Sequence, residues 1–200
     1  NVMQVKDHGA LVHRGFFRAI DAVWPQIEPR LKDFLKASPR TIRITGHSLG
    51  GALATLAAIR IQRMGIRNVE TYTFGQPRVG NRAMAEQLTT PLYRFAYYAD
   101  PVRFAPFSVP RAMHYKHAGT LKLIDAAGRI VDKESHLLVR MLSNICSTGQ
   151  LADEFRKNDF KSFLAKRIND HYMPSYIAHI ENNLLRLEDF GPKTPRLEER

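Results

Sequence analysis

The sequence predicts an α/β fold with a mostly parallel central sheet flanked by helices. Two observations support this fold class, and the length sets the number of domains. Short β-branched segments alternate with segments whose apolar residues recur every three or four positions, and this alternation implies crossover connections between parallel strands. A Gly-rich sequence, GHSLGG, stands between one such strand and the helix that follows it. The 200 residues are enough for one domain with a sizeable core.

Each expected element follows from its local pattern. Residues 14–37 carry apolar residues at helical spacing, so we expect an amphipathic helix there, bent before Pro25 and Pro29 and ended by SPR at 38–40. The expected strands are TIRIT at 41–45, VETYTF at 69–74 and LYRFAYY at 92–98. Between them we expect a buried helix closed by Gly65 and a short helix around 81–89.

The second half of the sequence predicts a hairpin and then helices. MHYKHAGTLKLI and RIV flank a DAAG turn, which indicates two antiparallel strands. The remainder fits three helices at about 135–146, 153–167 and 173–188, as a helical insertion before the last element. We therefore expect a single domain over residues 1–190, incomplete at its N-terminus, and a tail over 191–200.

Charge and hydropathy limit the classes of binding partner that we expect. Net charge is +11, but the cations are spread along the chain, and the densest segment, 155–167, fits the solvated face of an amphipathic helix. No nucleic-acid motif accompanies the charge, so we expect no nucleic-acid partner and leave peripheral membrane association open. The chain has no run of roughly 18 apolar residues and no signal-peptide pattern at its start, so a soluble or peripheral protein is expected and its compartment is left open.

Cysteine and metal-ligand patterns point to no cofactor. Cys146 is the single cysteine, so no intramolecular disulfide is expected, and its apolar surroundings predict an inert side chain. The histidines and acidic residues do not follow metal-ligand spacing, and we expect no metal site.

Gly46-His47-Ser48-Leu49-Gly50 matches G-x-S-x-G, which presents a nucleophilic serine on a strained strand-to-helix turn. A glycine at each end lets the strand and helix approach closely, and the helix N-terminus offers backbone N–H groups to a developing oxyanion. A Gly-rich turn with a chance serine is the alternative, but the predicted strand before the motif and helix after it favour the nucleophile.

A serine nucleophile needs a base and an orienting carboxylate, in the chain order serine, acid, histidine. Asp100 directly follows the third strand, at the sheet end where the turn also lies; its alternative role is to start an Asp-Pro turn. His171 stands in a polar turn before a helix, which suits a catalytic base. The remaining downstream histidines fit structural roles: His114 and His117 in a strand, and His136 and His179 in helices.

The sequence resembles the class 3 lipase family, the fungal-lipase-like members of the α/β-hydrolase superfamily. The segments that carry the resemblance are VHRGF at 12–16, TGHSLGGALA at 45–54, TFGQPRVGN at 73–81, DPV at 100–102 and DHYMPSYI at 170–177. The GQPRVGN segment is the most specific because it is not part of the general serine-hydrolase pattern. YKHAG at 115–119 resembles a structural strand of the same family.

The resemblance implies a serine ester hydrolase (triacylglycerol lipase or carboxylesterase) that acts on lipid esters at a membrane or droplet interface through an acyl-enzyme intermediate. Ser48 corresponds to the nucleophile, Asp100 to the orienting carboxylate, His171 to the general base and the Leu49 N–H to one oxyanion donor. A phospholipase A1 or galactolipase is an alternative, because loops outside these motifs choose the head group. A non-catalytic lipase-like module that binds membranes is another.

One family feature has no counterpart in this sequence. The family places its second oxyanion donor, a Ser or Thr after Arg-Gly, on a strand well upstream of VHRGF, and its lid follows that strand. Only eleven residues precede Val12. We therefore expect that N-terminal strands are missing from this chain and that an upstream segment of the same protein is required. The helices expected over 134–167 are a candidate mobile cover over the site.

Overall fold

A computed structural model describes residues 4–37, 41–98, 100–106, 114–125, 127–131 and 169–188. Its central layer is a five-stranded sheet in the order β3–β4–β5–β6–β7. The strands are β3 (Ile42–His47), β4 (Val69–Phe74), β5 (Leu92–Tyr97), β6 (Thr120–Ile124) and β7 (Ile130–Val131). The pairs from β3 to β6 are parallel and β7 is antiparallel to β6, which confirms the predicted mostly parallel sheet.

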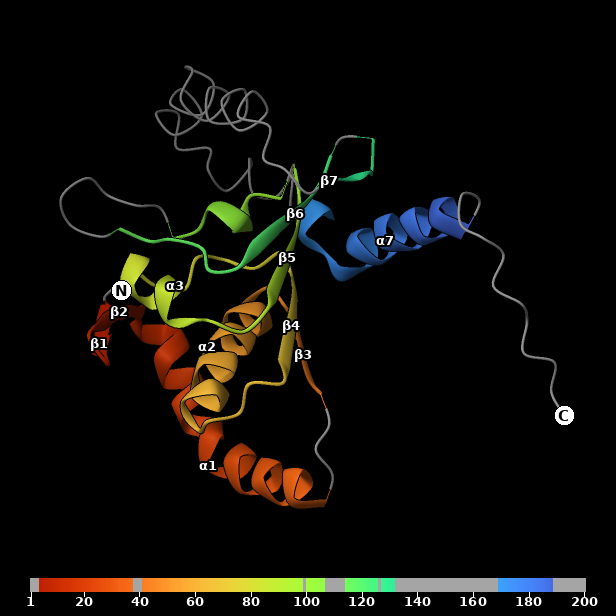
Figure 1. Cartoon of the computed structure of the whole chain (residues 1–200). Helices are drawn as coiled ribbons and strands as arrows, with labels where there is room; N and C mark the ends of the chain where they lie inside the picture. Colours follow the sequence, from red (N-terminus) through yellow and green to blue (C-terminus); the bar gives the residue numbers. More distant parts are fainter. Residues whose placement is uncertain are drawn as a thin grey trace, which may run out of the picture.

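Helices lie on both sides of this sheet. On one side lie α1 (Arg14–Ala37) and α2 (Leu49–Arg63), and on the other lies α7 (Met173–Glu188), which is beside only one end of the sheet (Figure 1). A short α3 (Arg82–Gln87) links β4 to β5, and a single 3-10 turn, η1 (Val102–Phe104), follows β5. The helix α1 runs through Pro25 and Pro29 without ending. None of the helices described is both long and apolar enough to cross a membrane.

The strands β4 and β5 follow the predicted segments closely. In both, buried residues alternate with partly buried ones, and Val69 on the buried side of β4 packs against Ala58 and Ile61 of α2. The strand β3 continues two residues beyond TIRIT, through Gly46 and His47, so the nucleophile motif begins inside the strand. The predicted helices at 135–146 and 153–167, the segment 38–40, the tail at 191–200, Cys146 and His136 lie outside the described residues.

The prediction that His114 and His117 lie in a strand is wrong. The strand β6 begins only at Thr120, and the preceding segment contributes one isolated bridge, from Lys116 to Gly80. The reason is Gly119, whose left-handed backbone (φ 72°) interrupts the extended chain, and whose missing Cβ leaves room for the Leu92 carbonyl. The hairpin of β6 and β7 is confirmed from Thr120 onward.

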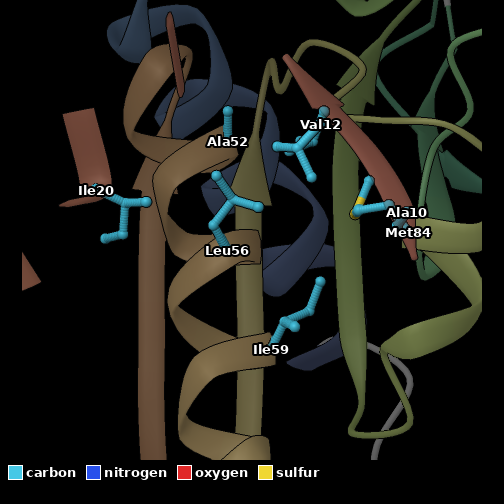
Figure 2. Packing of buried hydrophobic residues seen from close by; sticks show 8 residues of the cluster. Ala10, Val12, Ile20, Ala52, Leu56, Ile59 and Met84 are labelled. Carbon is cyan, nitrogen blue, oxygen red and sulfur yellow. The ribbon is translucent and has the colours of Figure 1, made fainter. Parts of the chain in front are cut away.

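A hairpin of two short strands, β1 (Gln4–Asp7) and β2 (Ala10–His13), was not predicted. Its turn uses His8 (φ 45°) and Gly9 (φ 80°), and the left-handed backbone at both positions matches a tight two-residue hairpin. The hairpin belongs to the core: the fully buried Ala10 and Val12 pack with residues of α1, α2 and α3 (Figure 2). The cluster comprises Ala10, Val12, Ile20, Ala52, Leu56, Ile59, Val79 and Met84.

Candidate active site

Ser48 occupies the sharp turn between β3 and α2. Its φ of 54° lies in the left-handed region, which costs a non-glycine residue roughly 1–3 kcal/mol and persists only where the surroundings enforce it. The Ser48 N–H donates to the Phe74 carbonyl at 2.9 Å, which ties the turn to β4. Gly46 is required at this corner, because a Cβ there would overlap the Gly50 carbonyl. Strand and helix therefore cross in direct backbone contact, as the motif predicts.

Asp100 is fully buried directly after β5 and accepts three hydrogen bonds. The Val102 N–H donates to Oδ1 at 2.8 Å, the Tyr176 hydroxyl donates to Oδ2 at 2.6 Å, and His171 Nδ1 lies 2.9 Å from the same Oδ2. A carboxylate can be buried when its oxygens are satisfied in this way. The arrangement fixes the carboxyl group and directs one oxygen at the imidazole.

His171 joins Asp100 to Ser48. Its side chain is only 9% exposed, and its Nε2 lies 2.8 Å from Ser48 Oγ. Because a carboxylate only accepts hydrogen bonds, Nδ1 carries the proton toward Asp100, and the unprotonated Nε2 accepts from the Ser48 hydroxyl. Residues separated by 71 and 123 positions in the sequence thus form one continuous hydrogen-bonded chain.

Gly75, the first residue of GQPRVGN, makes room for this chain. Its backbone is left-handed (φ 56°), and a Cβ there would lie 2.8 Å from Asp100 Oδ2 and 3.0 Å from His171 Nδ1. At the other end of the segment, Asn81 Oδ1 accepts from the Met84 N–H at 3.0 Å, which caps α3, and from the Leu11 N–H at 3.1 Å. The GQPRVGN segment therefore connects the site to the β1–β2 hairpin. These two contacts give a physical reason why the segment has this particular sequence.

Tyr176 is a further site residue that the sequence reasoning missed. The ring is fully buried, and besides donating to Asp100 its hydroxyl accepts from the Tyr97 N–H at 3.1 Å. Burial, and then the Asp100 carboxylate, raise the pKa of Tyr176 well above its ordinary value, so the hydroxyl stays protonated and can donate. Its position in DHYMPSYI, five residues after His171, was the available signal.

The other described histidines lie outside this chain of hydrogen bonds. His117 Nε2 donates to the Arg103 carbonyl at 2.8 Å, and burial together with nearby arginines lowers its pKa well below the ordinary value. His179 stacks on Tyr97 with ring centroids 4.7 Å apart, and His114 is exposed. His47, inside the motif, contacts His171 instead of Ser48. Among the described residues, no group of three or more His, Cys, Asp or Glu could hold a metal ion.

Leu49 is the first residue of α2, so its backbone N–H has no intrahelical acceptor and is available to a ligand beside Ser48. The α/β sheet, the strained serine between β3 and α2, and the Ser-His-Asp chain together define the α/β-hydrolase class of protein. The family model described as Lipase (class 3) matches residues 1–109. The chain belongs to the class 3 lipase family.

This chain matches only part of the length of each of the following relatives. The secreted mono- and diacylglycerol lipase 1 of Fusarium solani is 36% identical over 130 residues, covering 63% of this chain and 37% of that protein. The crystal structure of a lipase from Rhizopus microsporus var. chinensis has 35% identity and a TM-score of 0.56, covering 62% of this chain and 46% of the other. This chain therefore spans between a third and a half of the length of these two relatives.

A third match is the structure of a triacylglycerol lipase whose catalytic centre is described as a serine protease triad. It is 35% identical to this chain, with a TM-score of 0.56, and the match covers 62% of this chain and 50% of that one.

Proposed function

We propose that this chain carries the catalytic residues of a serine ester hydrolase that cleaves acyl-lipid esters. The observation that supports this most strongly is the continuous hydrogen-bonded chain from Asp100 through His171 to Ser48, with distances of 2.9 and 2.8 Å. A non-catalytic module has no need for a buried carboxylate, an imidazole and a strained serine in this arrangement. The name of the related triacylglycerol lipase structure is consistent with the same chemistry.

In the proposed mechanism, His171 Nε2 takes the Ser48 proton while the oxygen attacks the ester carbonyl. Asp100 keeps the imidazole in the reactive tautomer and stabilises the positive charge that forms on it. The tetrahedral intermediate then collapses, and His171 gives the proton to the departing alcohol. Water activated by the same nitrogen attacks the acyl-enzyme, releases the fatty acid and restores Ser48.

The Leu49 N–H would supply one donor to the negative oxygen of the intermediate. A second donor is proposed to come from an upstream segment of the same protein. Its place would be the free edge of β3, which in the part of the chain that the structure describes pairs only with β4. Ile42 and Ile44 of β3 are only half-buried, whereas strands inside a parallel sheet are usually covered on both faces. Loss of one oxyanion donor typically costs about a hundredfold or more in rate.

The proposed substrate is a glycerol-based acyl lipid at an interface. Leu49 and Tyr172, which directly follow Ser48 and His171 in the sequence, are 50% and 52% exposed. Exposed apolar residues next in the chain to the nucleophile and the base suit an acyl ester presented by a lipid surface. The names of the relatives, mono- and diacylglycerol lipase and triacylglycerol lipase, agree with this substrate class. A phospholipase A1 or galactolipase activity would use the same residues with another head group.

Hydrolysis assays test the proposal. The chain is given a short-chain nitrophenyl ester and, separately, dispersions of diacylglycerol, phosphatidylcholine and a galactolipid, with Ser48→Ala as the matched inactive control. Release of fatty acid from diacylglycerol above the Ser48→Ala background supports a glyceride lipase, and preferential release from a polar lipid supports the alternatives. Lipid binding that is equal in both proteins, without hydrolysis of any ester, would support a membrane-binding module and contradict the proposal.

A further inference from the structure

His47, the residue before the nucleophile, reaches across the site to the segment that carries the base. Its Nε2 lies 2.6 Å from the backbone carbonyl oxygen of His171. The two imidazole rings also pack on each other, with centroids 4.7 Å apart and planes tilted by 33°. His47 is thus both bonded to the His171 backbone and packed against the His171 side chain.

The hydrogen bond to the His171 carbonyl determines which ring nitrogen of His47 carries the proton. A carbonyl oxygen only accepts hydrogen bonds, so His47 Nε2 must carry a proton and donate it. The position of His47 is itself fixed, because it is the last residue of β3 and its backbone aligns with Phe74 of the neighbouring strand. A donor on the rigid sheet therefore holds the peptide group of a residue that lies outside the sheet.

His171 precedes α7 and lies 123 positions after Ser48 in the sequence. Two hydrogen bonds join His171 to the corner between β3 and α2. One links its Nε2 to Ser48 Oγ, and the other runs from His47 to its backbone carbonyl. Only the first can take part in proton transfer, whereas the second holds the His171 backbone whatever partner the His171 imidazole has.

We infer that His47 is a positioning residue for the proposed reaction, and that its Nε2–H and ring set the distance and angle of the His171 imidazole toward Ser48. This inference rests on the proposed function of Ser48, Asp100 and His171. It assigns to the variable position of G-x-S-x-G a role of its own in this chain. His47 Nε2 is not available to accept the serine proton, because that nitrogen donates to the His171 carbonyl.

Two variants separate the donor from the ring. His47→Phe keeps an aromatic ring against His171 and removes the donor, whereas His47→Gln places an amide N–H near the position of Nε2. We measure the rate constant for labelling of Ser48 by a fluorophosphonate, kcat and KM for a soluble nitrophenyl ester, and the proton NMR signal of the His171 Nδ1–H. Thermal unfolding verifies that both variants are folded.

The expected result is a fall of about 10- to 100-fold in kcat and in labelling rate for His47→Phe, because small misplacements of catalytic groups carry costs of that order. KM stays within about twofold, and His47→Gln recovers activity to within about fivefold of the parent. In His47→Phe the His171 Nδ1–H signal broadens or disappears, and in His47→Gln it remains.

Parental kinetics and an unchanged Nδ1–H signal in His47→Phe would overturn the inference, as would equal losses in the two folded variants. The NMR signal also separates this inference from the proposed function. If Ser48 of the parent fails to react, the proposed function is contradicted, while retention or loss of the signal in the two variants still decides whether His47 positions His171.

Discussion

Substitution of Gly75 by alanine should impair the site while leaving the rest of the fold in place. The added Cβ would stand 2.8 Å from Asp100 Oδ2 and 3.0 Å from His171 Nδ1, whereas ordinary contacts begin at 3.4 Å. Because Asp100 is fully buried and hydrogen-bonded by the Tyr176 hydroxyl and the Val102 N–H, the imidazole is the group that must yield. A shift of roughly half an ångström to one ångström in a catalytic group costs about 10- to 100-fold in rate.

Gly65→Ala is the matched control for backbone strain. Gly65 is also left-handed, with φ 85°, but no atom lies within 4 Å of its Cβ position. Each alanine should cost about 1–2 kcal/mol of stability from the left-handed conformation alone. That cost lowers Tm by about 2–8 °C for a chain of this size.

The assay is the rate constant for fluorophosphonate labelling of Ser48, measured on both variants below their Tm. Gly75→Ala should label at least about tenfold more slowly than Gly65→Ala. A folded Gly75→Ala variant that labels within threefold of Gly65→Ala would refute the argument that the missing Cβ makes room for Asp100 and His171.

Three further predictions concern the surroundings of the site. Tyr176→Phe removes a donor from Asp100 and the acceptor of the Tyr97 N–H, so it should lower the free energy of unfolding by about 2–3 kcal/mol; a loss below 0.5 kcal/mol in urea would contradict this role. Asp100→Asn should lower kcat by about 10³- to 10⁴-fold through loss of the reactive tautomer, and a folded variant with near-parental kcat would refute it. The depressed pKa of His117 keeps it neutral when folded, whereas the unfolded chain takes up its proton near pH 6.5. Acidification from pH 7 to pH 5 should therefore reduce stability by up to about 1.4 kcal/mol per pH unit, and His117→Gln should flatten that dependence; an equal slope in both proteins would count against the His117 contribution.

The fold class could be predicted because short, β-branched segments that alternate with helical patterns are detected locally. The segments at 69–74 and 92–98 are examples, and β4 and β5 lie there. The hairpin of β1 and β2 escaped prediction because each strand has only four residues and the turn uses His8. Pattern alone also extended the last hairpin toward residue 113, since the left-handed backbone at Gly119 depends on its packing against Leu92.

Some residues of the candidate site could be predicted from the sequence and others could not. Ser48, Asp100 and His171 could be proposed from a local motif, a strand end and the order of residues along the chain. Tyr176 and Gly75 could not be assigned, because their roles depend on which side chains meet between segments far apart in the sequence. Asp100 and Tyr176 are 76 residues apart and meet because α7 packs beside the end of β5. Local periodicity carries no information about that contact.

The most direct test of Ser48 as an activated nucleophile is the reaction of the chain with a fluorophosphonate probe, followed by mass spectrometry to locate the adduct. The probe reacts with an activated serine whatever the natural ester is, so it tests the hydrogen-bonded chain through His171 separately from substrate choice. A single adduct on Ser48, absent in Ser48→Ala, is expected. Protein shown to be folded that forms no adduct, or that is modified equally in Ser48→Ala, would contradict it.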